Sequence, residues 1–377
     1  MVKILIAGDF VPKDRVLKLI EEEKYSDIFS DILPYTDQCD YSILNLESPV
    51  VESSTATPIE KCGPHLKCTS KAIKAMKYAG FNMATLANNH FYDYGEEGVR
   101  DTLDACYREG VDIVGGGMNI NEASRVFYKE INDVKFAFIN CCEHEFSIAS
   151  DLSAGSNPLD PIKQYYAIIE AKAKADKIIV IVHGGHEHYQ LPSPRMQATY
   201  RFFVDLGADV VINHHQHCYS GYEVYKDKPI FYGLGNFCFD RETKRNSPWN
   251  QGYMVILNIS SDISFDVLPY YQGNEIPGIS LCSESDILIF NKTINNLNSI
   301  ISNVTKLTAE HELYMSSTSA GYISTLEPYT NRYLKYLYSR RLLPSFIKES
   351  KRLSLLNFII CESHRERLLN SLRSKIH

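Results

Sequence analysis

Six of the twelve histidines lie between His183 and His217, in two clusters that each follow an apolar run, IIVIVHGGHEH and ADVVINHHQH. Three other apolar runs also end in polar residues that bind metals, namely Asp9, Glu47, Asn88, Asn89 and His90. Carboxylate, amide oxygen and imidazole together suit Zn, Mn, Fe or Ni, and the absence of a cysteine cluster argues against a structural zinc. A carboxylate can also bridge two cations in a hydrolytic site. The residue types therefore predict a divalent metal centre with one or two ions.

The apolar runs that precede these residues predict buried strands, because Val, Ile and Leu continue in them without alternation. They cover residues 2–7, 41–46, 83–86, 136–141, 178–182 and 210–212. Helical patterns separate them at 70–79, 98–108, 164–174 and 196–206, and shorter strands follow at 222–225, 230–232, 253–259 and 263–270. This alternation predicts an α/β fold, in which ligands bind at the carboxyl ends of the strands. We expect one domain over 1–275 and a linker with a basic helical extension over 276–377.

The composition excludes several classes of protein. With 44% hydrophobic and 23% charged residues, the 377-residue chain is neither disordered nor embedded in a membrane. Its net charge of −7 disfavours a general nucleic-acid binder, so no nucleic-acid partner is expected. The ten cysteines contain no CxxC pair, and the first apolar run is too short for a signal peptide. We expect free thiols and a cytoplasmic location.

Six sequence pieces, spanning residues 5 to 240, carry a family resemblance. They are AGDF, NLESPV, AGFNMATLANNHFYDYG, HGGHEHY, GADVVINHHQH and PIFYGLGNFCFD. In this order they resemble the CapA/PgsA (PGA_cap) family, the poly-γ-glutamate capsule-biosynthesis branch of the calcineurin-like metallophosphoesterases. The resemblance implies a layered β core flanked by helices.

The resemblance also implies roles for residues of the metal centre. Asp9 would bind the first metal and Glu47 would bridge the two ions. Asn89, His183 and His215 would bind the second metal, and His217 would return to the first. These are the six expected metal ligands.

Catalytic and substrate-binding roles follow in the same way. His90 would contact the substrate and protonate the leaving group, and Asp93 would orient its imidazole. Glu187 would contact substrate or position water. The remaining candidates for substrate contact are Asn45, Asn88, His188 and Asn236.

Three departures from the superfamily pattern bear on this site. Val11 stands where the Asp-x-His motif has its histidine, so one ligand of the first metal is missing. Asn213 replaces a glycine, and Gly184 replaces a tryptophan. We expect the position at Gly184 to be open to a bulkier or differently charged substrate. His214 has neighbours that fill the ligand positions, so we expect it at the rim of the site.

Residues 330–377 contain 11 Lys/Arg and three Asp/Glu, a balance of +8. Apolar residues recur there with helical spacing, as at Tyr333, Leu337 and Leu342. One interpretation is a helical appendage packed on the catalytic domain with a solvated basic face. The others are a basic surface for an anionic membrane, which would place the protein at the inner face of that membrane, or for an anionic polymer or polymer-synthase partner.

Two functions from different classes follow. The first is a metal-dependent hydrolase in capsule or poly-γ-glutamate biosynthesis, in which a metal-activated water attacks a phosphoester or an amide of an anionic polymer. The second is a non-catalytic, metal-binding assembly factor for a membrane-associated polymer synthase. The missing histidine at Val11 favours the second, whereas Asn89, His90 and Asp93 favour the first.

Overall fold

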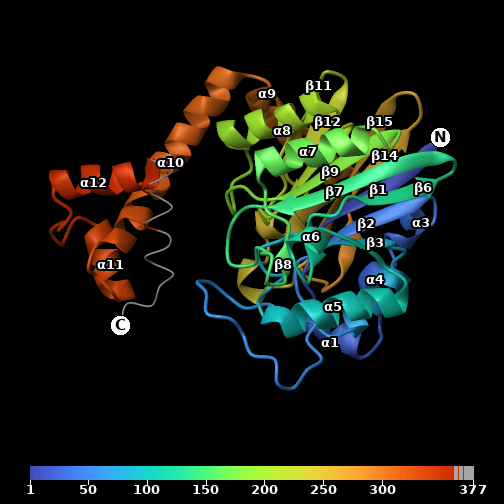
Figure 1. Ribbon diagram of the computed structural model, residues 1–377, viewed down its shortest axis with the longest axis horizontal. Helices are drawn as coiled ribbons and strands as arrows, with labels where there is room; N and C mark the ends of the chain where they lie inside the picture. Colours follow the sequence, from blue (N-terminus) through green and yellow to red (C-terminus); the bar gives the residue numbers. More distant parts are fainter. Residues whose placement is uncertain (361–363, 365–367, 369–377) are drawn as a thin grey trace. The chain divides into compact units, whose positions relative to one another are not determined.

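The computed structural model describes residues 1–360, 364 and 368, in two compact units that divide at Thr308 and Ala309 (Figure 1). The first unit contains two large sheets. One has the strand order β16 (Ile279–Leu281), β15 (Ile263–Gln272), β14 (Gln251–Ile259), β1 (Val2–Phe10), β2 (Tyr41–Leu46), β3 (Met83–Thr85) and β4 (Asp112–Val114), and β13 (Asn236–Cys238) also pairs with β1. The other has the order β11 (Tyr222–Tyr225), β12 (Lys228–Phe231), β10 (Val210–His214), β9 (Lys177–His183), β7 (Val134–Cys142) and β6 (Phe127–Ile131). A short pair joins β5 (Gly116–Gly117) to β8 (Gly155–Ser156).

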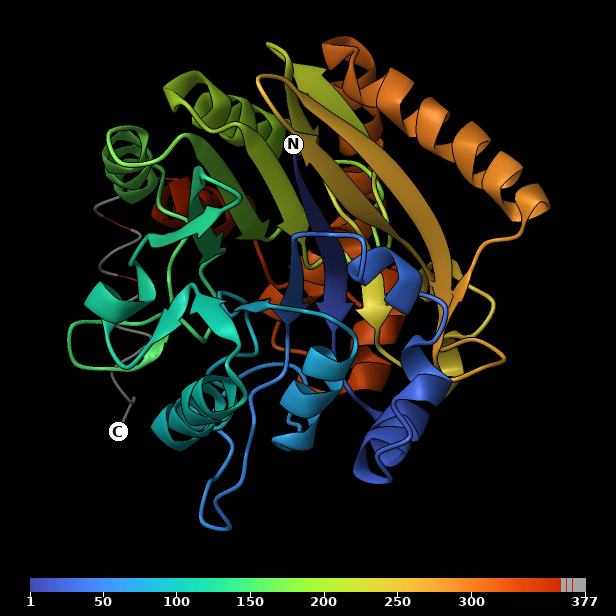
Figure 2. The ribbon, with the colours of Figure 1, turned by 90° about the vertical axis from the view of Figure 1, so that its right-hand side faces the viewer.

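The two sheets pack face to face and helices cover their outer faces, as the predicted layered β core requires (Figures 1 and 2). Along β1, Ile4 and Ile6 enter the core shared with the second sheet, whereas Leu5 and Ala7 enter the core shared with helices. This alternation follows from the two-residue period of a strand, and it explains why every position of the run is apolar. The α/β class is confirmed.

The helices of the first unit begin and end at recognisable signals. Asp160 and Ser193 accept backbone N–H bonds at the start of α7 (Pro161–Lys172) and α8 (Pro194–Leu206), which lie against the second sheet. The first sheet is covered by α1 (Asp14–Glu21), α2 (Ser26–Phe29), α4 (Lys71–Tyr78) and α5 (Gly95–Glu109). The short helices α3 (Leu33–Thr36) and α6 (Ile120–Ala123) complete this part. The four helical patterns expected from the sequence correspond to α4, α5, α7 and α8.

The compact first unit extends beyond the boundary expected at residue 275. Helix α9 (Glu284–Ile301) begins with a capping box between Ser283 and Asp286 and buries one face in the core of the sheets. That face consists of Phe290, Ile294, Leu297 and Ile301, spaced four, three and four residues apart. The structure therefore divides the chain at residue 308, because α9 completes the apolar cover of the first unit.

The second unit is helical where it is described. Helix α10 (Val304–Leu326) enters it, and α11 (Arg332–Ser339) and α12 (Glu349–Ile360) follow. Residues 361–363, 365–367 and 369–377, which carry part of the predicted basic extension, lie outside the described residues. Within the described part of the chain, no helix is both long and apolar enough to cross a membrane.

The burial of α9 yields a stability test. Phe290 is 7% exposed and Leu288, two residues earlier on the same helix, is 71% exposed. We expect Phe290→Ala to lower the free energy of unfolding by about 3 kcal/mol, because the substitution leaves a cavity in the core. Leu288→Ala should change it by less than about 0.5 kcal/mol. Urea denaturation of the full chain measures both, and equal effects would contradict the placement of α9 in the first unit.

Candidate metal centre

The six expected metal ligands come together where strands of the two sheets end. Asp9 lies in β1, Glu47 directly follows β2, and Asn89 follows β3. From the second sheet, His183 ends β9, and His215 and His217 follow β10. All six side chains are buried. Parallel strands place their carboxyl ends at one edge of a sheet, which is why residues distant in sequence meet here.

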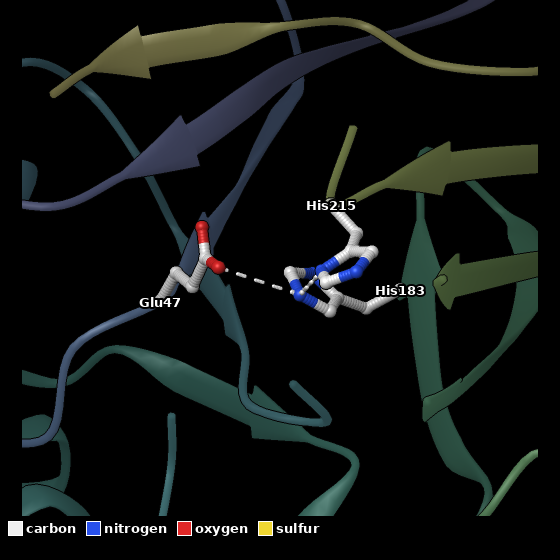
Figure 3. A group of neighbouring side chains, drawn as sticks. All are labelled: Glu47, His183 and His215. Atoms are coloured by element: carbon white, nitrogen blue, oxygen red, sulfur yellow. Dashed lines mark hydrogen bonds and ion pairs between the residues drawn. The ribbon is translucent and has the colours of Figure 1, made fainter. Parts of the chain in front are cut away.

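Four of these ligands surround one point. The Nε2 atom of His183 lies 3.4 Å from Glu47 Oε1, 3.0 Å from His215 Nδ1 and 3.0 Å from Asn89 Oδ1. Figure 3 shows Glu47 facing the two imidazoles from the opposite sheet. Glu47, His183 and His215 can each offer a ligand atom within 4.8 Å of the other two. This is the second-metal set that the resemblance implies.

A second set shares Glu47. Asp9, Glu47 and His217 also bring their ligand atoms within 4.8 Å of one another. His217 Nε2 lies 3.9 Å from Glu47 Oε1, the oxygen that also faces His183. Glu47 therefore stands between the two sets, where a bridging carboxylate would have to be.

The electrostatics of the site fit a divalent cation. Both carboxylate oxygens of Glu47 are buried, and neither accepts a hydrogen bond from the residues that the structure describes. Burial raises the pKa of Asp9 to about 7 and raises the pKa of Glu47 well above its usual range, and the charge of Asp9 adds to the latter effect. Burial also lowers the pKa of His183 and His217, so these imidazoles are neutral and cannot balance the carboxylates. A bound cation would compensate both charges.

A close approach between two backbones sets the position of Asp9. The amide of Asp9 donates to Gly235 O over 3.1 Å, and a Cβ on Gly8 would collide with the same oxygen. Glycine is therefore required at position 8 for β1 to meet the segment that leads into β13. Asn45 and Asn236 lie beside Asp9 in register on the two neighbouring strands.

Three of the four residues that we expected to contact substrate are buried, and they form hydrogen bonds with other residues of the site. Asn45 donates to Asp9 Oδ1 over 2.7 Å, and Asn236 Oδ1 lies 2.9 Å from His217 Nδ1. Asn88 donates to the carbonyl of Leu46 and accepts from the amide of His90. Their amide groups are used to orient ligands and backbone, so the structure places them behind the ligands and away from the open cleft. Only His188 of the four lines the cleft.

The structure also corrects the expectations for His214 and Gly184. His214 is 2% exposed rather than at the rim, and its Nδ1 lies 3.5 Å from Asp9 Oδ1. Burial lowers the pKa of His214 to about 3, so it packs as a neutral ring. The position at Gly184 is filled by Glu143, whose carboxylate accepts from the amide of Gly185.

His90 and Asp93 form the expected pair. His90 Nδ1 lies 2.7 Å from Asp93 Oδ2, which fixes the ring and leaves Nε2 for a substrate. Asp93 also accepts from the amide of Leu66 and forms an ion pair with Lys61, whose side chain is 3% exposed. Lys61 was not predicted from the sequence, because a single lysine in a loop carries no pattern that indicates burial.

The cleft beside these residues has a volume of about 470 Å³. Its walls include His90, Asn89, His217, and the expected Glu187 and His188. Sequence reasoning missed Glu145, Arg241 and Trp249, which also line it. Val11, the residue in place of the missing histidine, packs in an apolar cluster with Leu66, Phe239 and Trp249 at this wall.

The chain is similar to several known proteins. The family model described as "Bacterial capsule synthesis protein PGA_cap" matches residues 3–241. The chain is 33% identical over 244 residues to the capsule biosynthesis protein CapA of Bacillus anthracis, covering 63% of this chain and 59% of that protein. It is 34% identical over 238 residues to the PGA biosynthesis protein CapA of Bacillus subtilis (strain 168), covering 62% of each. The matches thus span about three-fifths of these relatives. A solved structure described as a novel phosphatase from Mycoplasma pneumoniae has a TM-score of 0.47 and 17% identity, over 73% of this chain and 95% of that one.

Glu47 provides a test for metal binding. We expect Glu47→Gln to abolish the stabilisation by added Mn²⁺ or Zn²⁺, which for the unchanged chain should reach about 2.7 kcal/mol at one hundred times the dissociation constant. The metal-free variant should be at least as stable as the metal-free parent near neutral pH. Glutamine removes the free-energy cost of burying a carboxyl whose pKa is raised well above its usual range and whose oxygens have no donor among the described residues. Thermal melting with metal or EDTA measures both effects. Glu187→Gln, in the same cleft, should keep the metal response, and a retained response in Glu47→Gln would contradict the site.

Asp9 provides a test by pH. Its pKa is raised on folding, so its contribution to the metal-free fold is full below about pH 4 and is lost as the pH rises through about 7. Between about pH 4 and about pH 7, the free energy of unfolding of the metal-free parent should therefore fall by about 2–4 kcal/mol relative to that of Asp9→Asn. Urea denaturation in EDTA at several pH values measures the difference. A difference independent of pH would show that Asp9 is not a buried, uncompensated acid.

Proposed function

Since the chain belongs to the bacterial capsule synthesis protein PGA_cap family, we propose that it is a metal-dependent hydrolase that acts on a phosphoester or an amide of an anionic polymer during capsule synthesis. The names of the two Bacillus relatives, capsule biosynthesis protein and PGA biosynthesis protein, support the biological context. The matched length covers only about three-fifths of those proteins, so the substrate is taken from the chemistry of the cleft.

The His90–Asp93 pair beside the ligand sets is the observation that carries the proposal. A cation with a purely structural role would need the ligands but no oriented imidazole. Here Asp93 Oδ2 lies 2.7 Å from His90 Nδ1. His90 lines the cleft, and it directly follows the expected ligand Asn89 in the sequence. An imidazole fixed in this way next to a metal centre is the arrangement of a general acid or base.

The ligand sets suit hydrolysis. When bound, a divalent cation supplies Lewis-acid polarisation of the scissile group and lowers the pKa of a water. Glu47 and the imidazoles of His183 and His215 would hold it, with Asn89 as a fourth donor. The set of Asp9, Glu47 and His217 offers three protein ligands. Catalytic zinc sites also have three protein ligands, and their fourth coordination position is left for water or substrate.

The chain's own groups perform the proton transfer in this proposal. Asp93 accepts the hydrogen bond from His90 Nδ1 and stabilises the imidazolium form of the ring. From that form, Nε2 donates a proton to the leaving oxygen or nitrogen. Burial lowers the pKa of His90, and the bond to Asp93 opposes this effect, so the ring can release its proton readily.

The place of action and the partner of the C-terminal unit are also proposals. We infer that the protein works in the cytoplasm at the inner face of the membrane and meets the membrane or a polymer synthase through residues 330–377. Helix α11 supports this, because its exposed Tyr333 and Tyr336 lie among Arg332, Lys335 and Arg340.

His90→Ala tests the hydrolase. We expect it to lower kcat by about a hundredfold or more on the responsive substrate, because the proton donor is lost. The substrates are p-nitrophenyl phosphate, a diester analogue and poly-γ-glutamate, with Mn²⁺, Ni²⁺ or Zn²⁺. Metal content, measured by elemental analysis, should stay at the parental value, which separates loss of chemistry from loss of the site.

Two results would contradict the proposal. One is the absence of turnover on every substrate by the fully metallated chain. The other is normal cellular function of His90→Ala together with loss of function in a chain that ends before residue 330. The second result would assign the protein to the assembly of a polymer synthase.

A further inference from the structure

Two cationic side chains, Arg241 and Lys244, lie over the indole of Trp249, and of these three residues Arg241 and Trp249 line the cleft. The guanidinium carbon of Arg241 is 5.6 Å from the ring centroid, and Lys244 Nζ is 5.8 Å from it. Trp249 is 4% exposed and donates its indole N–H to Phe239 O over 2.8 Å, so the ring is fixed. Cation–π attraction therefore gives both charges a defined place.

The acid next to Arg241 in the chain is already paired elsewhere. Asp240 is 1% exposed and accepts from Arg15 Nη2 at 2.8 Å and Nε at 2.9 Å. Arg241 has extended backbone angles, φ −151° and ψ 110°, so its side chain leaves on the opposite side and lines the cleft. Neither Arg241 nor Lys244 takes part in the ion pairs found among the described residues. Their charges remain available to a ligand.

One aromatic ring separates these cations from the metal centre. The ring centroid of Trp249 is 4.8 Å from that of His217, a ligand of the first set. His188 lies 5.7 Å from Trp249 and 6.2 Å from His217. The same cleft also contains the carboxylates of Glu145 and Glu187, which would repel an anionic ligand. A cationic contact at this wall would offset that repulsion for an anionic substrate.

We propose that Arg241 and Lys244, supported by Trp249, form an anion subsite that binds a carboxylate of the substrate unit next to the one at the metal centre. The class of ligand is a carboxylate-bearing polymer, of which γ-linked glutamate is the test case. A guanidinium binds the two oxygens of a carboxylate in one plane, and a lysine adds a point charge. Phosphate offers similar oxygens, so the experiment includes it. The inference deepens the proposed function and rests on it only for the identity of the reacting unit.

Trp249 is the only tryptophan of the chain, so its fluorescence reports on this subsite without any turnover. The full chain is titrated in EDTA, which prevents metal-dependent hydrolysis, with three probes: an oligomer of γ-glutamate, a neutral oligomer of γ-glutamine and inorganic phosphate. We expect the emission to change with the γ-glutamate oligomer and not with the neutral one. Tighter binding of phosphate than of the γ-glutamate oligomer would overturn the assignment to a carboxylate and would indicate a phosphate-bearing substrate.

Charge variants decide whether the two cations are responsible. The double variant Arg241→Gln/Lys244→Gln should weaken binding of the γ-glutamate oligomer about tenfold or more, the effect of losing about 1.4 kcal/mol. Arg241→Lys should bind more tightly than the double variant and more weakly than the parent, because it keeps the charge and loses the planar contact to two oxygens. This partial rescue separates a role of charge from a role in folding. The matched control Arg100→Gln/Lys74→Gln removes two exposed charges from α5 and α4 and should leave the affinity unchanged.

The failure of this inference can be distinguished from that of the proposed function. Equal affinity of the double variant and the parent for the γ-glutamate oligomer, or equal binding of the neutral oligomer, would overturn the subsite whether or not the protein is a hydrolase. Binding that depends on Arg241 without turnover of any substrate would retain the subsite and overturn the hydrolase.

Discussion

The structure depends on two carboxylates, Asp9 and Glu47, that are buried together beside neutral imidazoles. Burial raises the pKa of both acids, and the oxygens of Glu47 accept no hydrogen bond. In a metal-free protein this arrangement costs free energy, because a buried anion needs a compensating charge. This cost falls where the strand ends of the two sheets converge. A divalent cation bound by residues of both sheets would compensate the buried carboxylates. It would also connect the two sheets.

The surrounding residues keep this centre rigid. Asn45 and Asn236 lie on the strands that flank Asp9, and Gly8 lets the backbone near Gly235 approach closely. His90 and its partner Asp93 then stand at the boundary between the buried ligands and the cleft. In the proposed function, the buried ligand candidates would hold a cation, and the imidazole of His90 at the cleft would transfer a proton. In the proposed anion subsite, Arg241 and Lys244 would add the recognition of a charged substrate.

Much of the fold and the ligand set followed from local patterns. Uninterrupted Val/Ile/Leu runs such as that of β1 predicted strands covered on both faces, and the polar residue after each run predicted a site at the strand ends. Asp9, Glu47, Asn89, His183, His215 and His217 were identified in this way together with the family resemblance, and the structure brings all six together. The extent of the first unit was not predictable from the same patterns, since the burial of α9 depends on an apolar surface made by both sheets.

The sequence by itself determined which residue types end the strands, and therefore that carboxylates, amides and imidazoles would meet at one edge of the fold. Only the tertiary structure decided which of them face the cleft. Asn45, Asn88, Asn236 and His214 are buried behind the ligands, whereas Lys61, Arg241 and Trp249, unmarked in the sequence, line the cleft. The physical reason is that strand periodicity sets the side of the sheet on which a residue lies. Its distance from solvent is set by loops that arrive from remote parts of the chain.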